Sequence, residues 1–242
     1  MAQPTNPVRR LLFQTGTSLL AMLASLVLAL YHATLEIVVE GDDEIRLTRG
    51  QSSNFILAVW HTFVDAAAFG LHTHNLLIYS DHPRTKNYRR SIQNISREVG
   101  LKTLNNLGYE VLDASLGKQS QGIMNFIKAI RSGRPALVAP DGPSGPNYEA
   151  KPGVIYMARK SDSVVIPVGV GCNWRITGPN WDDFILPLPF ARIALVYGKA
   201  ITPSADTSEE SLARQASEME RQLDELCFRA RDLAEGKAAA GN

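Results

Sequence analysis

A histidine and an aspartate follow directly on a short apolar run. In the stretch FILAVWHTFVDAAAFG, residues 55–70, the run ends at Trp60, His61 comes next, and Asp65 lies four residues further on. Residues four apart share one face of a helix, so Asp65 could accept a hydrogen bond from one ring nitrogen and leave the other to take a proton. This predicts a general base with an orienting carboxylate. A core histidine beside a solvated carboxylate fits the same pattern, so the pair alone leaves both interpretations open.

The loop APDGPSGP, residues 139–146, is a second segment that could contribute to a site. Its prolines restrict the backbone, and its glycines let a ligand approach the chain closely. Asp141 stands at the start of the loop, where its carboxylate could hold a substrate hydroxyl or a basic side chain, or could cap a tight turn. Asp141, Gly142 and Ser144 are therefore candidate substrate-binding residues.

An aromatic segment and a basic segment supply further candidates. Trp181, Phe184 and Phe190 could line a groove for an acyl chain or face a membrane, and they could equally belong to the core. Arg89 and Arg90 lie away from the apolar side of a predicted helix. A solvated helix face is the default interpretation of these arginines, and contact with a phosphate or an anionic head group is the alternative.

The elements that would position these residues alternate between strands and helices. The sequence predicts strands at 55–60, 76–79, 109–112, 135–140, 163–171 and 192–201, and helices at 61–69, 88–99, 123–130 and 153–161. A long C-terminal helix is predicted to begin with a capping box formed by Thr207 and Glu210. Apolar strands alternating with helices predict an α/β fold, a single domain with a mixed, mostly parallel sheet flanked by helices.

The N-terminal segment is apolar and uncharged from residue 11 to residue 35. A signal peptide, a membrane span and an interfacial helix are the three interpretations. Polar residues at helical spacing form one stripe, with leucines opposite: Gln14, Ser18, Ser25, His32 and Glu36 against Leu12, Leu19, Leu23, Leu26 and Leu30. This pattern favours a membrane-associated helix that does not cross the bilayer. The predicted division is residues 1–40, a core of 41–204, and a C-terminal helix and tail, 205–242.

The composition excludes some classes of function. The chain has 25 basic and 24 acidic residues among 242, so it has no electrostatic footprint for nucleic acid. Cys172 and Cys227 lie in no metal-ligand spacing and are expected to be reduced thiols.

Five blocks of the sequence, taken in order, resemble the lysophospholipid acyltransferase superfamily. The resemblance covers roughly residues 30 to 200 and is closest to a bacterial branch of unsettled substrate. The blocks are Trp60-His61, DGPSGP at 141–146, KPGVIYMAR at 151–159, VIPVGV at 165–170 and WDDFILPLPF at 181–190.

The resemblance implies transfer of an acyl group from an acyl-thioester to a lipid hydroxyl, with His61 as general base. The acyl donor would be coenzyme A or acyl carrier protein as co-substrate, with no metal or bound cofactor. In the superfamily four residues separate the histidine from the aspartate, whereas three separate His61 from Asp65. The implied partners are membrane lipid and the acyl carrier, and the implied location is the cytoplasmic face of the inner membrane.

Two departures from the branch concern arginines that would bind phosphate. Ser144 stands where the branch has arginine, and DASLGKQSQG, residues 113–122, replaces an RGS-like stretch. Lys118 could substitute for one arginine, although an ammonium lacks the bidentate fork. The alternative is therefore a catalytically inactive member of the fold that binds lipid or a membrane partner. A hydrolase ranks last because the chain has no Gly-x-Ser-x-Gly elbow.

Overall fold

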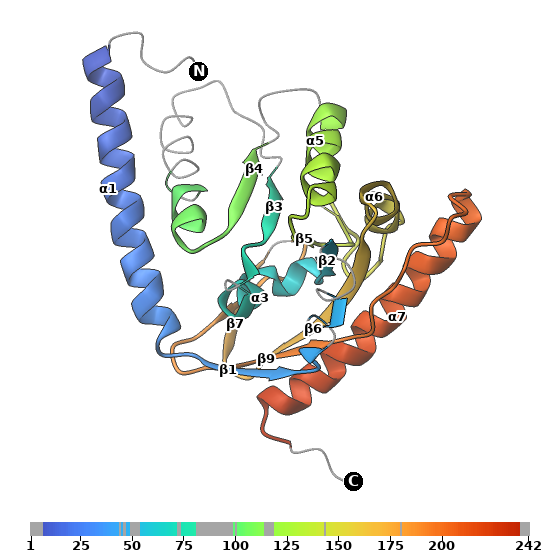
Figure 1. Ribbon diagram of the computed structural model, residues 1–242. Helices are drawn as coiled ribbons and strands as arrows, with labels where there is room; N and C mark the ends of the chain where they lie inside the picture. The colour runs from blue at the N-terminus through green and yellow to red at the C-terminus, as the bar shows by residue number, and fades with distance from the viewer. Residues whose placement is uncertain are drawn as a thin grey trace.

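The computed structural model describes residues 7–43, 45, 47–48, 54–71, 74–80, 99, 101–113, 119–142, 144–179 and 181–237. Figure 1 shows the regular elements, which follow one another as α1 (Pro7–His32), β1 (Glu36–Glu40), β2 (Phe55–Ala58), the 3-10 turn η1 (His61–Phe63), α3 (Val64–Leu71), β3 (Leu77–Ser80), β4 (Glu110–Asp113), α5 (Gln119–Arg131), β5 (Ala136–Val138), α6 (Gly153–Ser161), β6 (Val164–Cys172), β7 (Arg175–Thr177), β8 (Ile185–Pro187), β9 (Arg192–Tyr197) and α7 (Glu209–Ala234).

Seven strands of the described part of the chain form one sheet in the order β1-β9-β6-β2-β5-β3-β4. Neighbouring strands in this sheet are parallel, except that β6 and β9 are antiparallel. The strands β7 and β8 pair separately as a small antiparallel hairpin. The predicted α/β fold, with a mixed and mostly parallel sheet flanked by helices, is confirmed.

The central strand β2 is buried on both faces, which is why its sequence is a continuous apolar run. Phe55 and Leu57 pack in the core that includes α3, whereas Ile56, Ala58 and Trp60 pack with α5, α6 and α7. Because side chains alternate along a strand, Trp60 continues the series that faces α7. The sheet is thus the middle of three layers.

The helix α7 lies along β6 and β9 (Figure 1), and two glycines of β6 leave room for its backbone. A Cβ atom on Gly169 would lie 2.2 Å from the carbonyl carbon of Leu226, and one on Gly171 would lie 2.3 Å from that of Ala230. A larger residue at either position would therefore push the helix off the sheet.

The start of α7 differs from the prediction by one residue. Ser208, and not Thr207, is the N-cap, and its hydroxyl oxygen accepts a hydrogen bond from the Ser211 amide at 3.3 Å. The capping-box prediction was wrong because both residues can cap a helix, and a neighbouring side chain decides between them. The carboxylate of Asp206 accepts a hydrogen bond from the Ser208 amide at 2.9 Å and holds that residue in place.

The helix α1 contacts the rest of the protein through its polar stripe. Lys102 Nζ donates to Thr17 Oγ1 at 2.8 Å and to Ser18 Oγ at 3.1 Å, and Asn106 Nδ2 lies 3.1 Å from Ser25 Oγ. These contacts place the opposite face of α1 toward the outside of the molecule.

The last turn of α1 is also attached to the domain. The Tyr31 hydroxyl donates to the carbonyl of Pro187, and His32 Nε2 lies 3.0 Å from the carbonyl oxygen of Phe69. Among the described residues, the segment Phe13–His32 is long and apolar enough to cross a membrane, and 11% of its apolar 18-residue stretch is buried.

Candidate active site

His61 begins the turn η1 just beyond the carboxyl end of β2. The strand ends at Ala58, and α3 begins only at Val64. Carboxyl ends of parallel strands form the crevice in which open α/β sheets bind ligands. Because a 3-10 turn has three residues per turn, His61 and Asp65 do not have the geometry of two residues four apart on one α-helix.

Asp141 joins the loop 139–146 to the segment that carries His61. Its two carboxyl oxygens lie 3.3 and 3.4 Å from the His61 backbone nitrogen, which donates to them, and the residue has no exposed surface. Burial raises the pKa of the Asp141 carboxyl, while backbone hydrogen bonds from Asp141 itself, His61 and Tyr148 oppose this shift. The structure brings His61 and Asp141 together, with Asp141 capping the turn, and a contact of Asp141 with substrate stays a prediction.

The carboxylate beside the His61 ring belongs to Asp182, which is 121 positions away in the sequence. Asp182 Oδ2 lies 4.0 Å from His61 Nε2, and the Asp182 side chain is 12% exposed. This distance is longer than a hydrogen bond. Asp182 Oδ1 and His61 Nδ1 are both buried and have no hydrogen-bond partner among the described residues. Asp182 is therefore a carboxylate close to the His61 ring that makes no hydrogen bond to it.

Two contacts hold the loop of Asp182 against η1. The buried Thr62 hydroxyl lies 2.6 Å from the Asp182 carbonyl oxygen, to which it donates, and 3.1 Å from Asn147 Oδ1. The ring of Trp181 lies 5.1 Å from the His61 ring, centroid to centroid. A Cβ atom on Gly145 would lie 2.6 Å from the Trp181 ring, so the glycine is required for this approach. Three blocks that are distant in sequence thus meet around His61.

Asp65, the predicted partner of His61, makes no hydrogen bond or ion pair with the ring among the described residues. It is exposed. The pKa of its carboxyl is nevertheless raised, first because surrounding protein desolvates it and second because Asp182 is nearby, while His61 opposes the shift. The charges of Asp182 and His61 therefore both act on the Asp65 carboxyl.

The remaining candidates of the loop and of the basic segment are placed as follows. Gly142 has φ +72°, a conformation that favours glycine, and Ser144 is exposed. Lys118, Arg89 and Arg90 lie outside the described residues. Their contact with substrate stays a prediction.

The three aromatic candidates do not gather in one groove. Trp181 lies beside His61. Phe184 packs close to Gly178. Phe190 is 75% exposed, and its amide lies 3.4 Å from the Thr34 hydroxyl, near the end of α1.

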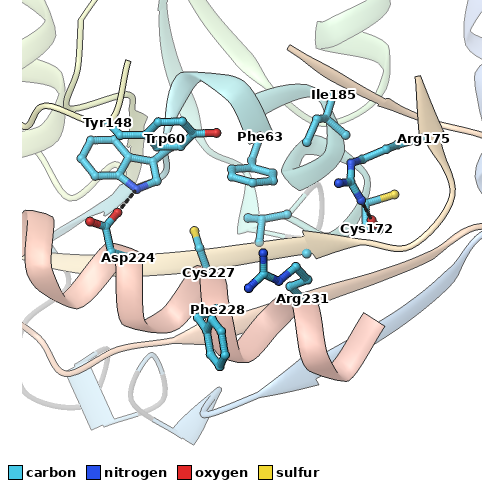
Figure 2. Close-up of a pocket in the computed structure, with 12 residues that line it drawn as sticks. Trp60, Phe63, Tyr148, Cys172, Arg175, Ile185, Asp224, Cys227, Phe228 and Arg231 are labelled. Atoms are coloured by element: carbon cyan, nitrogen blue, oxygen red, sulfur yellow. Dashed lines mark hydrogen bonds between the residues drawn. The ribbon is translucent and has the colours of Figure 1, made fainter. Parts of the chain in front are cut away.

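A pocket of about 350 Å³ adjoins the segment 60–63 (Figure 2). The strand β2 ends opposite Pro167 of β6, so among the described residues the later part of β6 has no strand neighbour on that side. Trp60 and Phe63 line the pocket from one direction, and α7 and the β7–β8 hairpin contribute the other walls. The pocket therefore lies at the carboxyl end of the parallel strands and reaches Trp60 and Phe63 on either side of His61 in the sequence. His61, Asp141 and Asp182 are not among the residues that line it.

The sequence interpretation missed Asp182, Thr62 and Tyr148. Asp182 lies within the WDDF block, where only the aromatic residues were considered. The sequence feature that could have indicated Asp182 is the pair of aspartates that follows Trp181, in a block that also contains prolines. Thr62 and Tyr148 had no signal of their own, because their roles depend on contacts with residues far away in sequence.

The fold is similar to that of a known lipid enzyme. The crystal structure of the 1-acyl-sn-glycerophosphate (LPA) acyltransferase PlsC from Thermotoga maritima matches with a TM-score of 0.51 and 17% sequence identity, over 94% of this chain and 81% of that chain. At this identity the likeness shows the fold.

The chain also matches a bacterial sequence more directly. It is 30% identical over 158 residues to the uncharacterized protein RP090 of Rickettsia prowazekii (strain Madrid E), covering 63% of this chain and 70% of that protein. The chain belongs to the same family as RP090. No protein-family model matches the chain.

Proposed function

We propose that this protein is an acyltransferase that moves a fatty acyl group from an acyl-thioester to the hydroxyl of a lysophospholipid or related lipid acceptor. Two findings support the proposal. The fold is that of PlsC, a 1-acyl-sn-glycerophosphate acyltransferase. The three blocks around residues 61, 141 and 182 meet at His61, with Asp141 at its backbone amide and Asp182 beside its ring.

In the proposed reaction His61 Nε2 takes the proton of the acceptor hydroxyl as the oxygen attacks the thioester carbonyl carbon. The carbon–sulfur bond then breaks, and the thiolate that leaves takes the proton back from the imidazolium. The products are an ester and a free thiol. Asp182, 4.0 Å from Nε2 and nearly buried, stabilises the positive charge that the ring carries between these two steps.

The position of His61 is the observation that carries the proposal. Its backbone amide donates to Asp141, its ring contacts the ring of Trp181, and Asp182 is attached to the same turn through Thr62. A side chain that must take a proton needs such a fixed position, because small errors in geometry lower the rate strongly.

The proposal is tested by supplying the purified protein with acyl-coenzyme A or acyl carrier protein thioesters and a panel of lysolipid acceptors. Free thiol and acylated lipid are measured together, and equal amounts of the two are expected. Lipid binding without thiol release across the panel would instead favour a non-catalytic lipid-binding protein. Thiol release without acylated lipid would indicate hydrolysis.

The two carboxylates near His61 are expected to differ in importance. Asp182→Asn should lower the rate of transfer by at least about 10-fold, because it removes the charge beside Nε2. Asp65→Asn should change the rate less.

Asp65 is expected to affect stability instead. Its carboxyl has a higher pKa in the folded protein than in the unfolded chain, so the folded protein loses stability as the pH rises from about 3.8 to the raised pKa. This loss persists at higher pH. Asp65→Asn should therefore raise the unfolding temperature at pH 7.

We also propose that the protein acts at the cytoplasmic face of the inner membrane, with α1 lying in the interface. The contacts of Lys102 and Asn106 run along the polar side of α1, and Tyr31 attaches its last turn. A helix attached along its length to the domain is suited to lie on a bilayer and not to cross it. The exposed Leu19 and Leu26 on its other side support contact with lipid.

A further inference from the structure

The pocket beside Trp60 has a charged end formed by two arginines. Arg175 extends from β7 and Arg231 from α7, and Figure 2 shows both side chains at the pocket together with Phe63 and Ile185. The two arginines are 56 positions apart in sequence and come from different elements. Only the fold brings them to one cavity.

Arg175 and Arg231 are exposed residues, and their guanidinium groups contact uncharged partners. Arg175 Nη1 donates to the carbonyl oxygen of Cys172 at 2.6 Å, and the Arg231 guanidinium lies 5.0 Å from the centroid of the Phe228 ring. Among the described residues, neither arginine has a carboxylate within ion-pair distance. Each guanidinium has five N–H donors, so most of these donors remain available to a ligand.

The other polar groups of the pocket do not neutralise this end. Burial raises the pKa of the Cys227 thiol to about 12, and burial also raises the pKa of the Cys172 thiol, so both are uncharged at neutral pH. Asp224 accepts a hydrogen bond from Trp60 Nε1 at 3.2 Å. The pKa of the Glu235 carboxyl is lowered first by its hydrogen bond with Lys237, at 2.6 Å, and further by the charges of Arg231 and Arg175.

The middle of the pocket is apolar. Phe63 and the buried Ile185 form its walls together with Val170 of β6. A cavity of about 350 Å³ is within the size range of small-molecule sites, about 300–1,000 Å³. An apolar cavity with two guanidinium groups at one end suits a molecule with an apolar chain and an anionic head.

We infer that this pocket binds a single-chain lipid with a phosphate-bearing head group, with Arg175 and Arg231 holding the phosphate and Phe63 and Ile185 contacting the first part of the chain. The inference rests on the proposed function, which it deepens by naming the head group of the acceptor and the residues that recognise it. Two guanidinium groups from different directions suit the several oxygens of a phosphate. Arg175 and Arg231 would supply cationic contacts in place of the arginine that the resembled branch has at the position of Ser144.

The test measures equilibrium binding to the full-length His61→Ala protein, in which turnover cannot consume the ligand. The probes are a monoacylglycerol phosphate below its critical micelle concentration, the monoacylglycerol and the fatty acid of the same chain length, glycerol phosphate, and coenzyme A. The variants Arg175→Gln and Arg231→Gln are compared with Arg221→Gln, a control on the same helix α7 whose side chain is ion-paired at the outer surface.

The monoacylglycerol phosphate should bind most tightly. Each pocket substitution should weaken its binding about 10-fold, and Arg221→Gln should leave it within about twofold. Equal binding of the monoacylglycerol or the fatty acid would overturn the assignment of a phosphate head group. Equal binding of glycerol phosphate or coenzyme A would overturn the requirement for a lipid chain, and unchanged binding in both pocket variants would overturn the site.

This outcome is separate from that of the proposed function. Binding that depends on the two arginines, in a protein that transfers no acyl group, would keep the pocket and remove the activity. Acyl transfer by the parent protein with unchanged activity and lipid affinity in both arginine variants would keep the activity and remove the pocket.

Discussion

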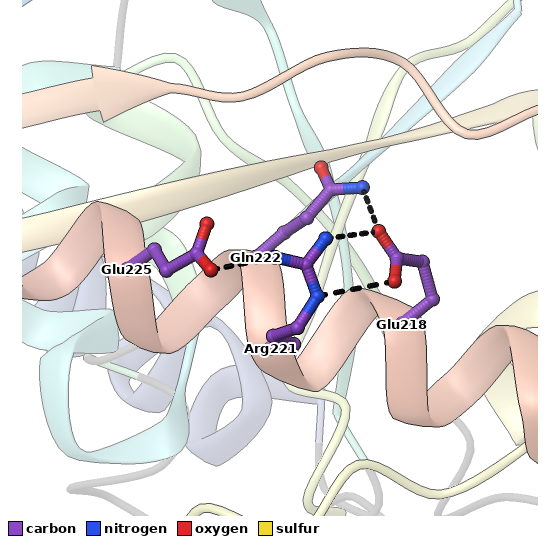
Figure 3. Close-up of polar contacts among 4 residues, drawn as sticks. All are labelled: Glu218, Arg221, Gln222 and Glu225. Atoms are coloured by element: carbon purple, nitrogen blue, oxygen red, sulfur yellow. Dashed lines mark hydrogen bonds and ion pairs between the residues drawn. The ribbon is translucent and has the colours of Figure 1, made fainter.

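The two longest helices of the described part of the chain, α1 and α7, each have 26 residues but present different chemistry to the outside. The outer face of α7 is charged: Figure 3 shows Arg221 bonded to Glu218 and Glu225, with Gln222 joining Glu218. The outer face of α1 is apolar. Its leucines at 19, 23, 26 and 30 are between 57% and 65% exposed.

The inner faces of the two helices differ in the opposite sense. Apolar residues of α7 such as Met219 and Leu223 are fully buried against the sheet. In contrast, the inner side of α1 combines the buried Ala21 with hydroxyl groups that contact Lys102 and Asn106. A helix with its polar side inward and its apolar side outward is suited to an apolar surrounding. The comparison supports the proposal that α1 lies against lipid, whereas the outer face of α7 has the charged pattern of a helix in water.

The largest expected effect concerns the outer face of α1. The triple substitution of Leu19, Leu23 and Leu26 by Gln should lower binding to phospholipid vesicles by about a thousand-fold. Each of these leucines would contribute about 1.5 kcal/mol or more when it is buried in the bilayer. Vesicle co-sedimentation measures this effect. The unfolding temperature in detergent-free buffer should not fall, because these side chains make no core contacts.

The matched control for this experiment uses α7. Replacing Glu218, Gln222 and Glu225 with Ala changes three residues on an outer helix face without changing the leucines. Vesicle binding should then stay within a few-fold of the parent. Equal vesicle binding by the parent and the leucine variant would contradict the comparison.

An intermediate effect is expected at the inner face of α7. Gly171→Ala should lower the free energy of unfolding by about 1–3 kcal/mol, since its Cβ would lie 2.3 Å from the Ala230 backbone. Gly16→Ala on α1 meets no atom within 4 Å and should stabilise its helix by up to about 1 kcal/mol. Denaturant unfolding of the two variants measures both values. A Gly171→Ala protein as stable as the parent would show that α7 is not packed as described.

The smallest effect is expected at the outer face of α7. Arg221→Gln removes the ion pairs with Glu218 and Glu225, but all three side chains are about half exposed. Exposed pairs of this kind contribute about 0.2–1 kcal/mol. Thermal unfolding should therefore change by at most a few degrees, and less in high salt. A larger loss would mean that this face is not simply solvated.

The sequence was sufficient to predict most elements of the fold. The helix α6 has the predicted bounds, Gly153–Ser161, and the apolar runs at 55–60 and 163–171 became β2 and β6. These segments are predictable because their patterns are local. The strand β1 lies in the N-terminal segment and was not predicted. It forms by pairing with β9, which joins residues more than 150 positions apart, so no local pattern indicates it.

The candidate site was predictable in part. The position of His61 after a buried strand and its nearness to Asp141 followed from two local patterns. The choice of Asp65 as partner assumed a regular helix, and the 3-10 turn at His61–Phe63 removes that geometry. Asp182 and the pair of Arg175 and Arg231 depend on long-range packing, so no local spacing could indicate them.

One comparison of rates tests the central claim most directly, namely that an imidazole at position 61 removes a proton from a lipid hydroxyl. The initial rate of acyl transfer from an acyl-thioester to a lysolipid is measured for the parent and for His61→Ala at equal protein concentration, after matching unfolding temperatures show that both are folded. The variant should be slower by about a hundred- to ten-thousand-fold. Equal rates for the two proteins would contradict the account.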